Sequence, residues 1–298
     1  RRVRGSRYRE PLTRRRARDS SGGNIMKSLV VQRRLEWAAV VFVTAAVYLL
    51  GSMALYAQGA GALSGPAGNT VKQKIPAGTI LPIVLATRIS FAKANAGQTV
   101  DGKIAQDVPL PDGSKIRKGS AVQGHVVEVS AGANGPQVTI RFDQVRLGDE
   151  WIPVVTDLRA IAGFMTIQQA YVPIEAPGEG SPYDWLPRNQ IGGDSVYGVG
   201  GPVTSAEDPS KVIGKAVDDG VLVEVSAKQG TPCRGAIENN DRAQAMWVFS
   251  GDACGVYGIE HLRIAHAGRT NPQGQIVLVA ERTNLKLSNG DGLLLRVQ

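Results

Sequence analysis

Short apolar runs of strand length recur along the chain from about residue 75 to its end. Eight such runs are separated by turn signals: 79–85, 99–108, 121–129, 138–147, 220–225, 245–250, 276–280 and 293–297. Turn residues separate these runs, among them Pro111-Asp112-Gly113 and Asn289-Gly290-Asp291-Gly292, which we expect to form hairpins. The pattern predicts an all-β protein made mainly of antiparallel strands.

The strand-like runs fall into two groups on either side of residues 176–210. This stretch is rich in Gly, Pro, Ser and Asp, and its prolines argue against a continuous strand ladder. We therefore expect two small antiparallel β-barrel or β-sandwich units, at 75–175 and 211–298, joined by a long connection. Three aromatic residues of the connection either form a binding surface or pin it onto the domain beneath: Tyr183, Trp185 and Tyr197.

One longer apolar stretch, residues 37–56, precedes the β-rich part of the chain. Basic residues come before it and small residues follow it, which is the order found in a signal peptide. Its length of about 20 residues is also enough to cross a bilayer once as a helix. We expect residues 26–58 to be a signal peptide cleaved near Ala57, with a retained single membrane anchor as the alternative, and residues 59–74 to be a linker.

The basic charge of the chain belongs to its first residues. Residues 1–36 hold 12 of the 34 Lys and Arg and 3 of the 26 acids, so 22 basic and 23 acidic residues remain for the rest. A body without excess positive charge has little to neutralise phosphates with, which argues against a nucleic-acid partner. We expect residues 1–25 to be disordered or not translated, with Met26 as a candidate start.

Cys233 and Cys254 are the two cysteines of the chain. Because the leader would send the body to an oxidising compartment, we expect them to form a structural disulfide. A metal site with Cys233, Cys254, His261 and His266 is the alternative. The absence of a C-x-x-C pair argues against it, so we expect no metal.

The order of short motifs in the first unit resembles the β-barrel module of TrbI-like conjugation and type IV secretion proteins. The matching segments are Ile75-Pro-Ala-Gly-Thr, Ala96-Gly-Gln-Thr-Val, Ile116-Arg-Lys-Gly-Ser and Gly124-His-Val-Val, within about residues 75–164. The resemblance implies a barrel and, as a possible role, an accessory component of a secretion or conjugation apparatus. Segments around Cys233 and Cys254 resemble exported bacterial proteins of unknown function.

No catalytic or cofactor-binding constellation stands out in the sequence. The chain has no G-x-S-x-G motif, and the glycines at 198–201 lack the G-x-G-x-x-G order. Asp218-Asp219 and Asp149-Glu150 lie next to glycines, where acids are common as solvated turn formers. We therefore expect neither catalytic residues nor a cofactor.

Together these features predict an exported bacterial envelope protein that is periplasmic or secreted, or held in the inner membrane by residues 37–56. Its expected role is non-enzymatic, with binding of an envelope protein or glycan through the Gly-rich connection and its aromatic residues. Contact with the membrane is expected only through the N-terminal segment. The alternative from another class is a periplasmic hydrolase that uses His261 or His266 with a nearby acid.

Overall fold

The computed structural model describes residues 74–132, 135–176, 178–180, 182, 185–226, 233, 242–265 and 273–298. All of them belong to one compact unit, Asn69–Gln298. The predicted leader, including the apolar stretch at 37–56, lies outside the described residues. Among the described residues, no helix has the length and apolar character needed to span a membrane.

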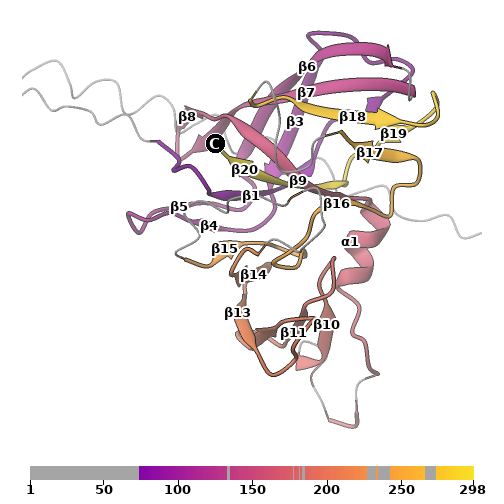
Figure 1. Ribbon diagram of the computed structural model, residues 1–298. Helices are drawn as coiled ribbons and strands as arrows, with labels where there is room; N and C mark the ends of the chain where they lie inside the picture. Colours follow the sequence, from indigo (N-terminus) through magenta and orange to yellow (C-terminus); the bar gives the residue numbers. More distant parts are fainter. Residues whose placement is uncertain are drawn as a thin grey trace, which may run out of the picture. The chain divides into compact units, whose positions relative to one another are not determined.

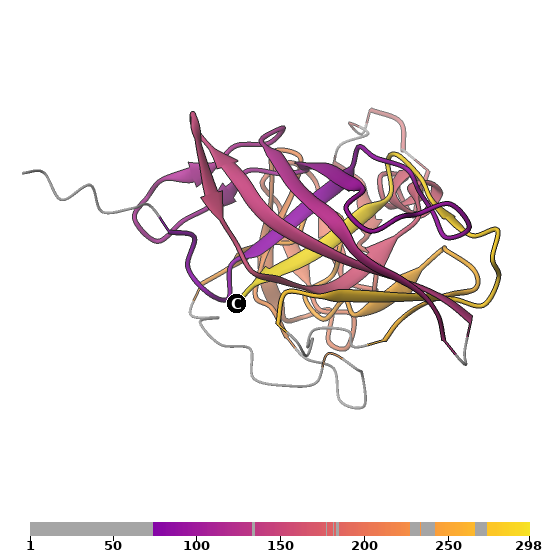
Figure 2. The same ribbon diagram turned by 90° about the horizontal axis from the view of Figure 1, so that it is seen from above.

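Ten strands form the larger sheet of this unit (Figure 1), in the order β16-β9-β20-β1-β3-β6-β7-β18-β17, with β8 beside β7. The pairs are antiparallel except for the parallel pair of β16 and β9. The sheet is strongly curled (Figure 2), and β16 and β17, at the two ends of its order, come next to each other. Its strands are β1 (Ile80–Leu85), β3 (Thr99–Ile104), β6 (Ala121–Gly132), β7 (Gly135–Leu147), β8 (Glu150–Pro153), β9 (Thr156–Ala162), β16 (Gly255–Tyr257), β17 (Leu262–Ile264), β18 (Ile276–Ala280) and β20 (Gly292–Val297).

A second sheet has six strands that follow one another in sequence order, each antiparallel to the next. These strands are β10 (Pro187–Asn189), β11 (Ser195–Tyr197), β12 (Pro202–Thr204), β13 (Val212–Val217), β14 (Gly220–Val223) and β15 (Gln244–Ala245). Two short pairs complete the β structure: β2 (Ile89–Ser90) with β19 (Lys286–Leu287), and β4 (Val108–Pro109) with β5 (Lys115–Ile116). One short helix, α1 (Phe164–Ala170), follows β9.

Strands β1, β9 and β20 are buried on both faces, because two hydrophobic cores meet at them. In β20, Leu293 and Leu295 belong to the core inside the curled sheet, whereas Leu294 faces the core shared with the six-stranded sheet. In β9, Ala160 and Ala162 contribute to that second core. Small side chains at these positions let the second sheet approach closely. A strand buried on both faces reads as a continuous apolar run, as LLL does in β20.

The all-β prediction agrees with the structure, but the two predicted groups of strands are not separate units. From the second group, β18 pairs with β7 and β20 lies between β1 and β9, so both complete the larger sheet. The predicted connection at 176–210 also contains three strands, β10, β11 and β12. Its prolines are compatible with them because Pro187 and Pro202 occupy first positions of strands, where no ladder donor is lost.

Two local predictions fail for identifiable reasons. The run at 245–250 continues β15 only to Ala245, because Phe249 N–H then donates to Met246 O at 2.9 Å and turns the chain. The predicted hairpin at 289–292 does not form, since β19 pairs with β2 while β20 pairs with β1 and β9. A local turn ends the first run, and in the second case long-range strand pairing replaces the local hairpin that the pattern suggests.

Candidate functional site

A cavity of about 560 Å³ lies between the C-terminal end of α1 and the six-stranded sheet. We call it the Trp247 pocket. This volume is within the usual range for small-ligand sites, about 300–1,000 Å³. The residues that line it come from α1, β10, β11, the β13–β14 hairpin and the turn after β15: Ala170, Tyr171, Arg188, Gln190, Val196, Gly198, Val199, Ala216, Val217, Asp218, Asp219, Gly220, Val221, Trp247 and Val248.

Trp247 has a backbone conformation that is rare for a large side chain, with φ of 54°. Two buried glutamine side chains hold it there. Gln106 Oε1 accepts the Trp247 N–H at 2.6 Å, and the amide nitrogen of Gln190, in the orientation that satisfies both carbonyls, donates to Trp247 O at 3.1 Å and Phe249 O at 3.3 Å. The backbone of Trp247 is therefore fixed on both sides of its Cα atom.

Gln106 also joins the two sheets, because its Nε2 donates to Val221 O of β14 at 2.8 Å. The close fit around it explains why residue 220 is glycine. A Cβ atom at Gly220 would lie 2.4 Å from Gln106 Oε1 and 2.7 Å from Trp247 Cα. Hence the hairpin residue Gly220, the buried amide and the strained tryptophan form one packed arrangement at the base of the pocket.

The indole of Trp247 reaches from this base to α1. Its Nε1–H donates to the hydroxyl of Tyr171 at 2.7 Å, and its ring packs against Gly292 and beside Ile167. Tyr171 is the C-cap residue of α1. Burial raises the pKa of Tyr171 above its usual value of 10.0, so the hydroxyl keeps its proton at neutral pH.

Charged side chains line one wall of the pocket and its rim. Asp219, at φ of 66° in the β13–β14 turn, forms an ion pair with Lys118 from the loop after β5. Asp218 has no hydrogen-bond or ion-pair partner among the residues that the structure describes. Arg188 adds a guanidinium from β10. The pocket thus offers hydrogen-bond donors and acceptors next to apolar side chains.

A second cavity of about 520 Å³ is lined by four carboxylates, Asp194, Glu207, Glu224 and Asp252, together with Lys211. Burial raises the pKa of Asp194, although its two oxygens accept N–H groups from Gly251 at 2.7 Å and Ala206 at 3.1 Å. These bonds hold two loops together. Within the described parts of the chain, no three acidic, histidine or cysteine side chains lie close enough to hold a metal ion.

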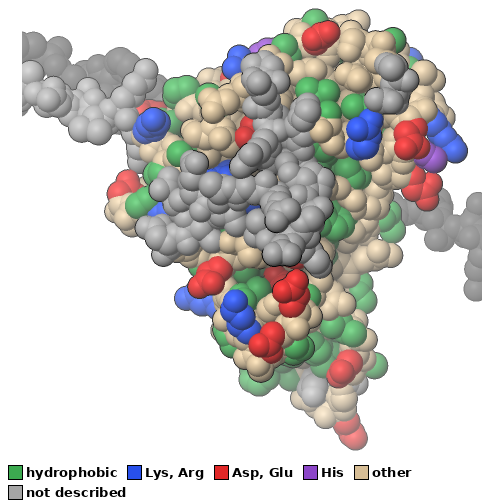
Figure 3. Space-filling view, viewed as in Figure 1, with side chains coloured by type: hydrophobic (Ala, Val, Ile, Leu, Met, Phe, Trp, Pro, Cys, Tyr) green, Lys and Arg blue, Asp and Glu red, His purple; other side chains and the backbone are tan. Residues whose placement is uncertain are grey.

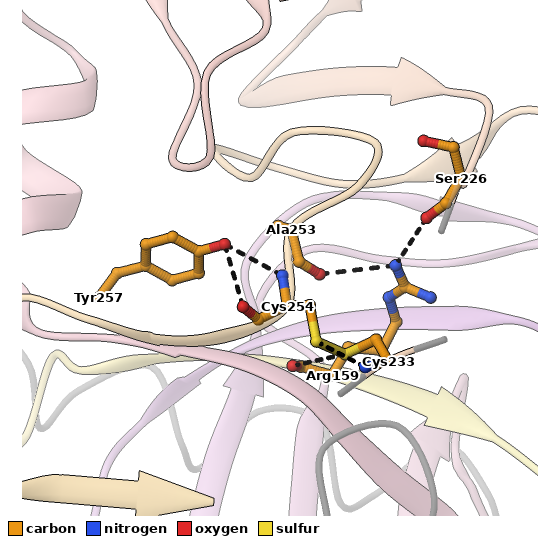
Figure 4. The surroundings of a disulfide bond; sticks show 6 residues. All are labelled: Arg159, Ser226, Cys233, Ala253, Cys254 and Tyr257. Atoms are coloured by element: carbon orange, nitrogen blue, oxygen red, sulfur yellow. Dashed lines mark hydrogen bonds between the residues drawn. A yellow bond between two sulfur atoms is a disulfide. The ribbon is translucent and has the colours of Figure 1, made fainter. Parts of the chain in front are cut away.

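Cys233 and Cys254 form a disulfide with their Cα atoms 5.8 Å apart (Figure 4). The bond lies over the buried Arg159 of β9, whose guanidinium donates to Ser226 O at 3.1 Å and Ala253 O at 3.5 Å. On the other side, Tyr257 accepts the N–H of Cys254 at 3.0 Å. Burial lowers the pKa of Arg159 to about 10, so it stays protonated at neutral pH. The surroundings of the bond are those of a structural cross-link.

Two of the aromatic residues predicted as a binding surface, Trp185 and Tyr197, are described by the structure, and neither lines the pocket. Trp185 is 69% exposed and Tyr197 is 39% exposed, while Tyr183 lies outside the described residues. Tyr197 stands between two residues that do line the pocket, Val196 and Gly198. Hydrophobic side chains gather on the side of the molecule formed by α1 and the six-stranded sheet (Figure 3).

The histidines considered for hydrolysis are remote from these cavities. His261 Nδ1 lies 2.9 Å from Glu281, and His125 Nδ1 lies 2.7 Å from Asp143, but neither histidine lines the two cavities described above. His266 lies outside the described residues. Within the described part, no hydroxyl or thiol hydrogen-bonds to His125 or His261, so neither is set beside a nucleophile.

Sequence reasoning missed the residues that build the Trp247 pocket. Trp247 was expected in a strand, and Asp218 and Asp219 were expected only as turn formers. No sequence signal marks Gln106 or Tyr171, because their role depends on partners at least 76 residues away. No protein family model matches the chain, and no curated protein is significantly similar to it.

Proposed function

We propose that this protein is an exported, non-enzymatic binding protein of the bacterial cell envelope and that the Trp247 pocket is its binding site. The observation that carries the proposal is the strained conformation of Trp247 at the base of the cavity. A non-glycine residue at positive φ costs on the order of 1–3 kcal/mol and persists where its surroundings fix it, which is common at ligand sites. Two buried glutamines supply that fixation here.

The groups around the pocket favour binding over covalent catalysis. Its lining includes no serine, threonine, cysteine or histidine among the residues that the structure describes. Asp219 is already neutralised by Lys118, and the Tyr171 hydroxyl retains its proton at neutral pH. Such groups can form hydrogen bonds to a ligand, whereas a nucleophile with its general base is not present among them.

Several features support a location in the cell envelope. The order of basic, apolar and small residues before residue 59 is that of an export signal. A disulfide is compatible with the oxidising compartment to which such a signal leads. The resemblance of the first strands to the TrbI-like module adds an envelope context in which the partner is another surface component, a protein or a glycan.

Exposed apolar residues beside the pocket extend the proposed binding surface. Val172 and Ile174 follow α1, and the backbone N–H of Ile174 donates to Pro187 O, which ties this segment to β10. Val199, which lines the pocket, is 68% exposed. Together with Trp185 and Tyr197 these residues would contact the envelope component around a group held in the pocket.

A pair of matched substitutions tests the proposal. Val199→Trp would place a large side chain at the pocket, whereas Val212→Trp makes the same change at a residue that is 61% exposed on the same sheet and does not line the pocket. The full chain would be mixed with washed sacculi and outer-membrane fragments of a Gram-negative bacterium and sedimented. We expect most of the Val199→Trp protein to stay in the supernatant, and Val212→Trp to sediment to the same extent as wild type. Equal sedimentation of all three proteins, or none, contradicts the proposal.

A further inference from the structure

The hydrogen bond between Trp247 and Tyr171 leaves the Tyr171 hydroxyl as a hydrogen-bond donor in the pocket. The Tyr171 oxygen accepts the indole N–H, and it has no other hydrogen-bond partner among the described residues. A phenolic hydroxyl that accepts one bond still has its own O–H to give. Tyr171 lines the pocket and is 38% exposed, so this O–H is available as a donor to a bound molecule.

An acceptor lies in the same cavity. Asp218 carries a carboxylate with no partner in the described part of the chain, and an ionised carboxylate is acceptor-only. Its neighbour Asp219 is held by Lys118. A ligand that satisfies both Tyr171 and Asp218 must therefore accept one hydrogen bond and donate another, as a hydroxyl-bearing molecule does.

The charges at the pocket balance one another. Among the described residues, Arg188 lines the pocket and Lys118 lies at its rim as two positive groups, and Asp218 and Asp219 contribute two negative groups. With groups of both signs present, the pocket offers no net electrostatic attraction to an anion or to a cation, which is compatible with a ligand without net charge. The remaining wall is apolar, with Val196, Val199 and Val248 among its residues, and it suits the C–H face of a ring.

We infer that the Trp247 pocket binds a neutral saccharide. One sugar ring combines hydroxyls that both donate and accept with faces of C–H groups, and the cavity of about 560 Å³ presents partners for each. Tyr171 donates to one ring oxygen or hydroxyl, Asp218 accepts from another hydroxyl, and the valines contact the C–H face. This inference rests on the proposed binding function and specifies the chemical class of the bound group.

The indole N–H of Trp247 provides a direct readout, because it bonds to the tyrosine that the sugar would contact. The chain has four tryptophans, so protein labelled with ¹⁵N-tryptophan gives up to four indole signals, and Trp247→Phe identifies the relevant one. The full chain would be titrated with maltose, cellobiose and N,N′-diacetylchitobiose, and separately with the zwitterionic dipeptide Ala-Ala. We expect a saturable shift of the Trp247 signal with at least one of the three saccharides.

Two pocket variants and one control complete the test. Tyr171→Phe and Asp218→Asn should each weaken saccharide binding about tenfold, the size expected when one ligand hydrogen bond is lost. Asp149→Asn, a change on an exposed turn, should leave it unchanged. Saturable binding of Ala-Ala alone would overturn the saccharide assignment and leave the binding function standing. If none of the saccharides shifts the Trp247 signal, the inference is overturned. The proposed binding function is tested separately by the Val199→Trp sedimentation assay.

Discussion

Asp291 Oδ1 accepts the backbone N–H of Phe164 at 3.0 Å, so the turn before the last strand caps the start of α1. Its other oxygen accepts the N–H of Ser288 at 2.7 Å. Gly163, at the N-cap position of the helix, has no side chain to do this. Because Tyr171 is the C-cap residue of α1, this bond connects the C-terminal turn to the Trp247 pocket through the helix.

Asp291→Asn is expected to lower the free energy of unfolding by about 1 kcal/mol. An amide keeps one acceptor but replaces the other with an NH₂ group, which would face an N–H donor of Phe164 or Ser288. Urea unfolding of the full chain measures the change. Asp112→Asn is the control, because Asp112 accepts from Ser114 in an exposed turn and should show a smaller loss. Equal losses would contradict the capping role.

Gly220→Ala should destabilise the protein by about 1–3 kcal/mol through overpacking. The added methyl group would collide with Gln106 Oε1 and Trp247 Cα. Gly119→Ala provides a contrast, since a Cβ atom there has open space but the residue has φ of 83°. Both variants should lose stability, but only Gly220→Ala should change the near-ultraviolet circular dichroism, because it alone moves Trp247. An unchanged spectrum would show that the packing around Gln106 is looser than described.

Replacing both cysteines, Cys233→Ala with Cys254→Ala, should cost about 3 kcal/mol, the entropy effect expected for closing a loop of this length. Urea unfolding with and without a reducing agent measures it. The reducing agent should lower the stability of the wild type toward that of the double variant and leave the variant unchanged. A wild type that is insensitive to complete reduction would argue against a stabilising role of the bond.

Asp194 gives a prediction for pH dependence. Burial raises its pKa in the folded protein above 3.8, so the folded state holds this proton more tightly than the unfolded state. The stabilising contribution is therefore full below the unfolded pKa and is lost as pH rises through the folded pKa. Between pH 3.5 and pH 7, the wild type should lose more stability, or gain less, than Asp194→Asn. Parallel stability profiles of the two proteins would contradict the raised pKa.

The sequence predicted the strands well where a short apolar run lies between turn residues. The runs predicted at 79–85, 121–129, 276–280 and 293–297 correspond to β1, β6, β18 and β20 of the structure. Alternation says which face of a strand is buried but not which strand lies beside it. For that reason the position of β20 between β1 and β9 was not predictable, and the chain was divided into two units that the structure does not contain.

The candidate site escaped prediction for a related reason. Met246 to Ser250 has the composition of a strand, yet Trp247 adopts positive φ because Gln106 and Gln190 hold its backbone from other parts of the chain. Local preference lost to tertiary contacts at this point. Such a disagreement between local sequence preference and structure is expected at strained or functional positions, and here it occurs at the residue that forms the base of the pocket.

The position of β20 also has a consequence for how the chain folds. β1, at Ile80–Leu85, pairs with β3 on one side and with β20, at Gly292–Val297, on the other, so one side of the first strand stays unpaired until the last strand has been synthesised. Pairing across so great a sequence separation is slow, because the chain loses the entropy of loop closure before the new contacts stabilise it. A chain in which β20 has not yet been made therefore lacks the strand that joins β1 to β9, and the larger sheet cannot be completed between them until synthesis reaches its last residues.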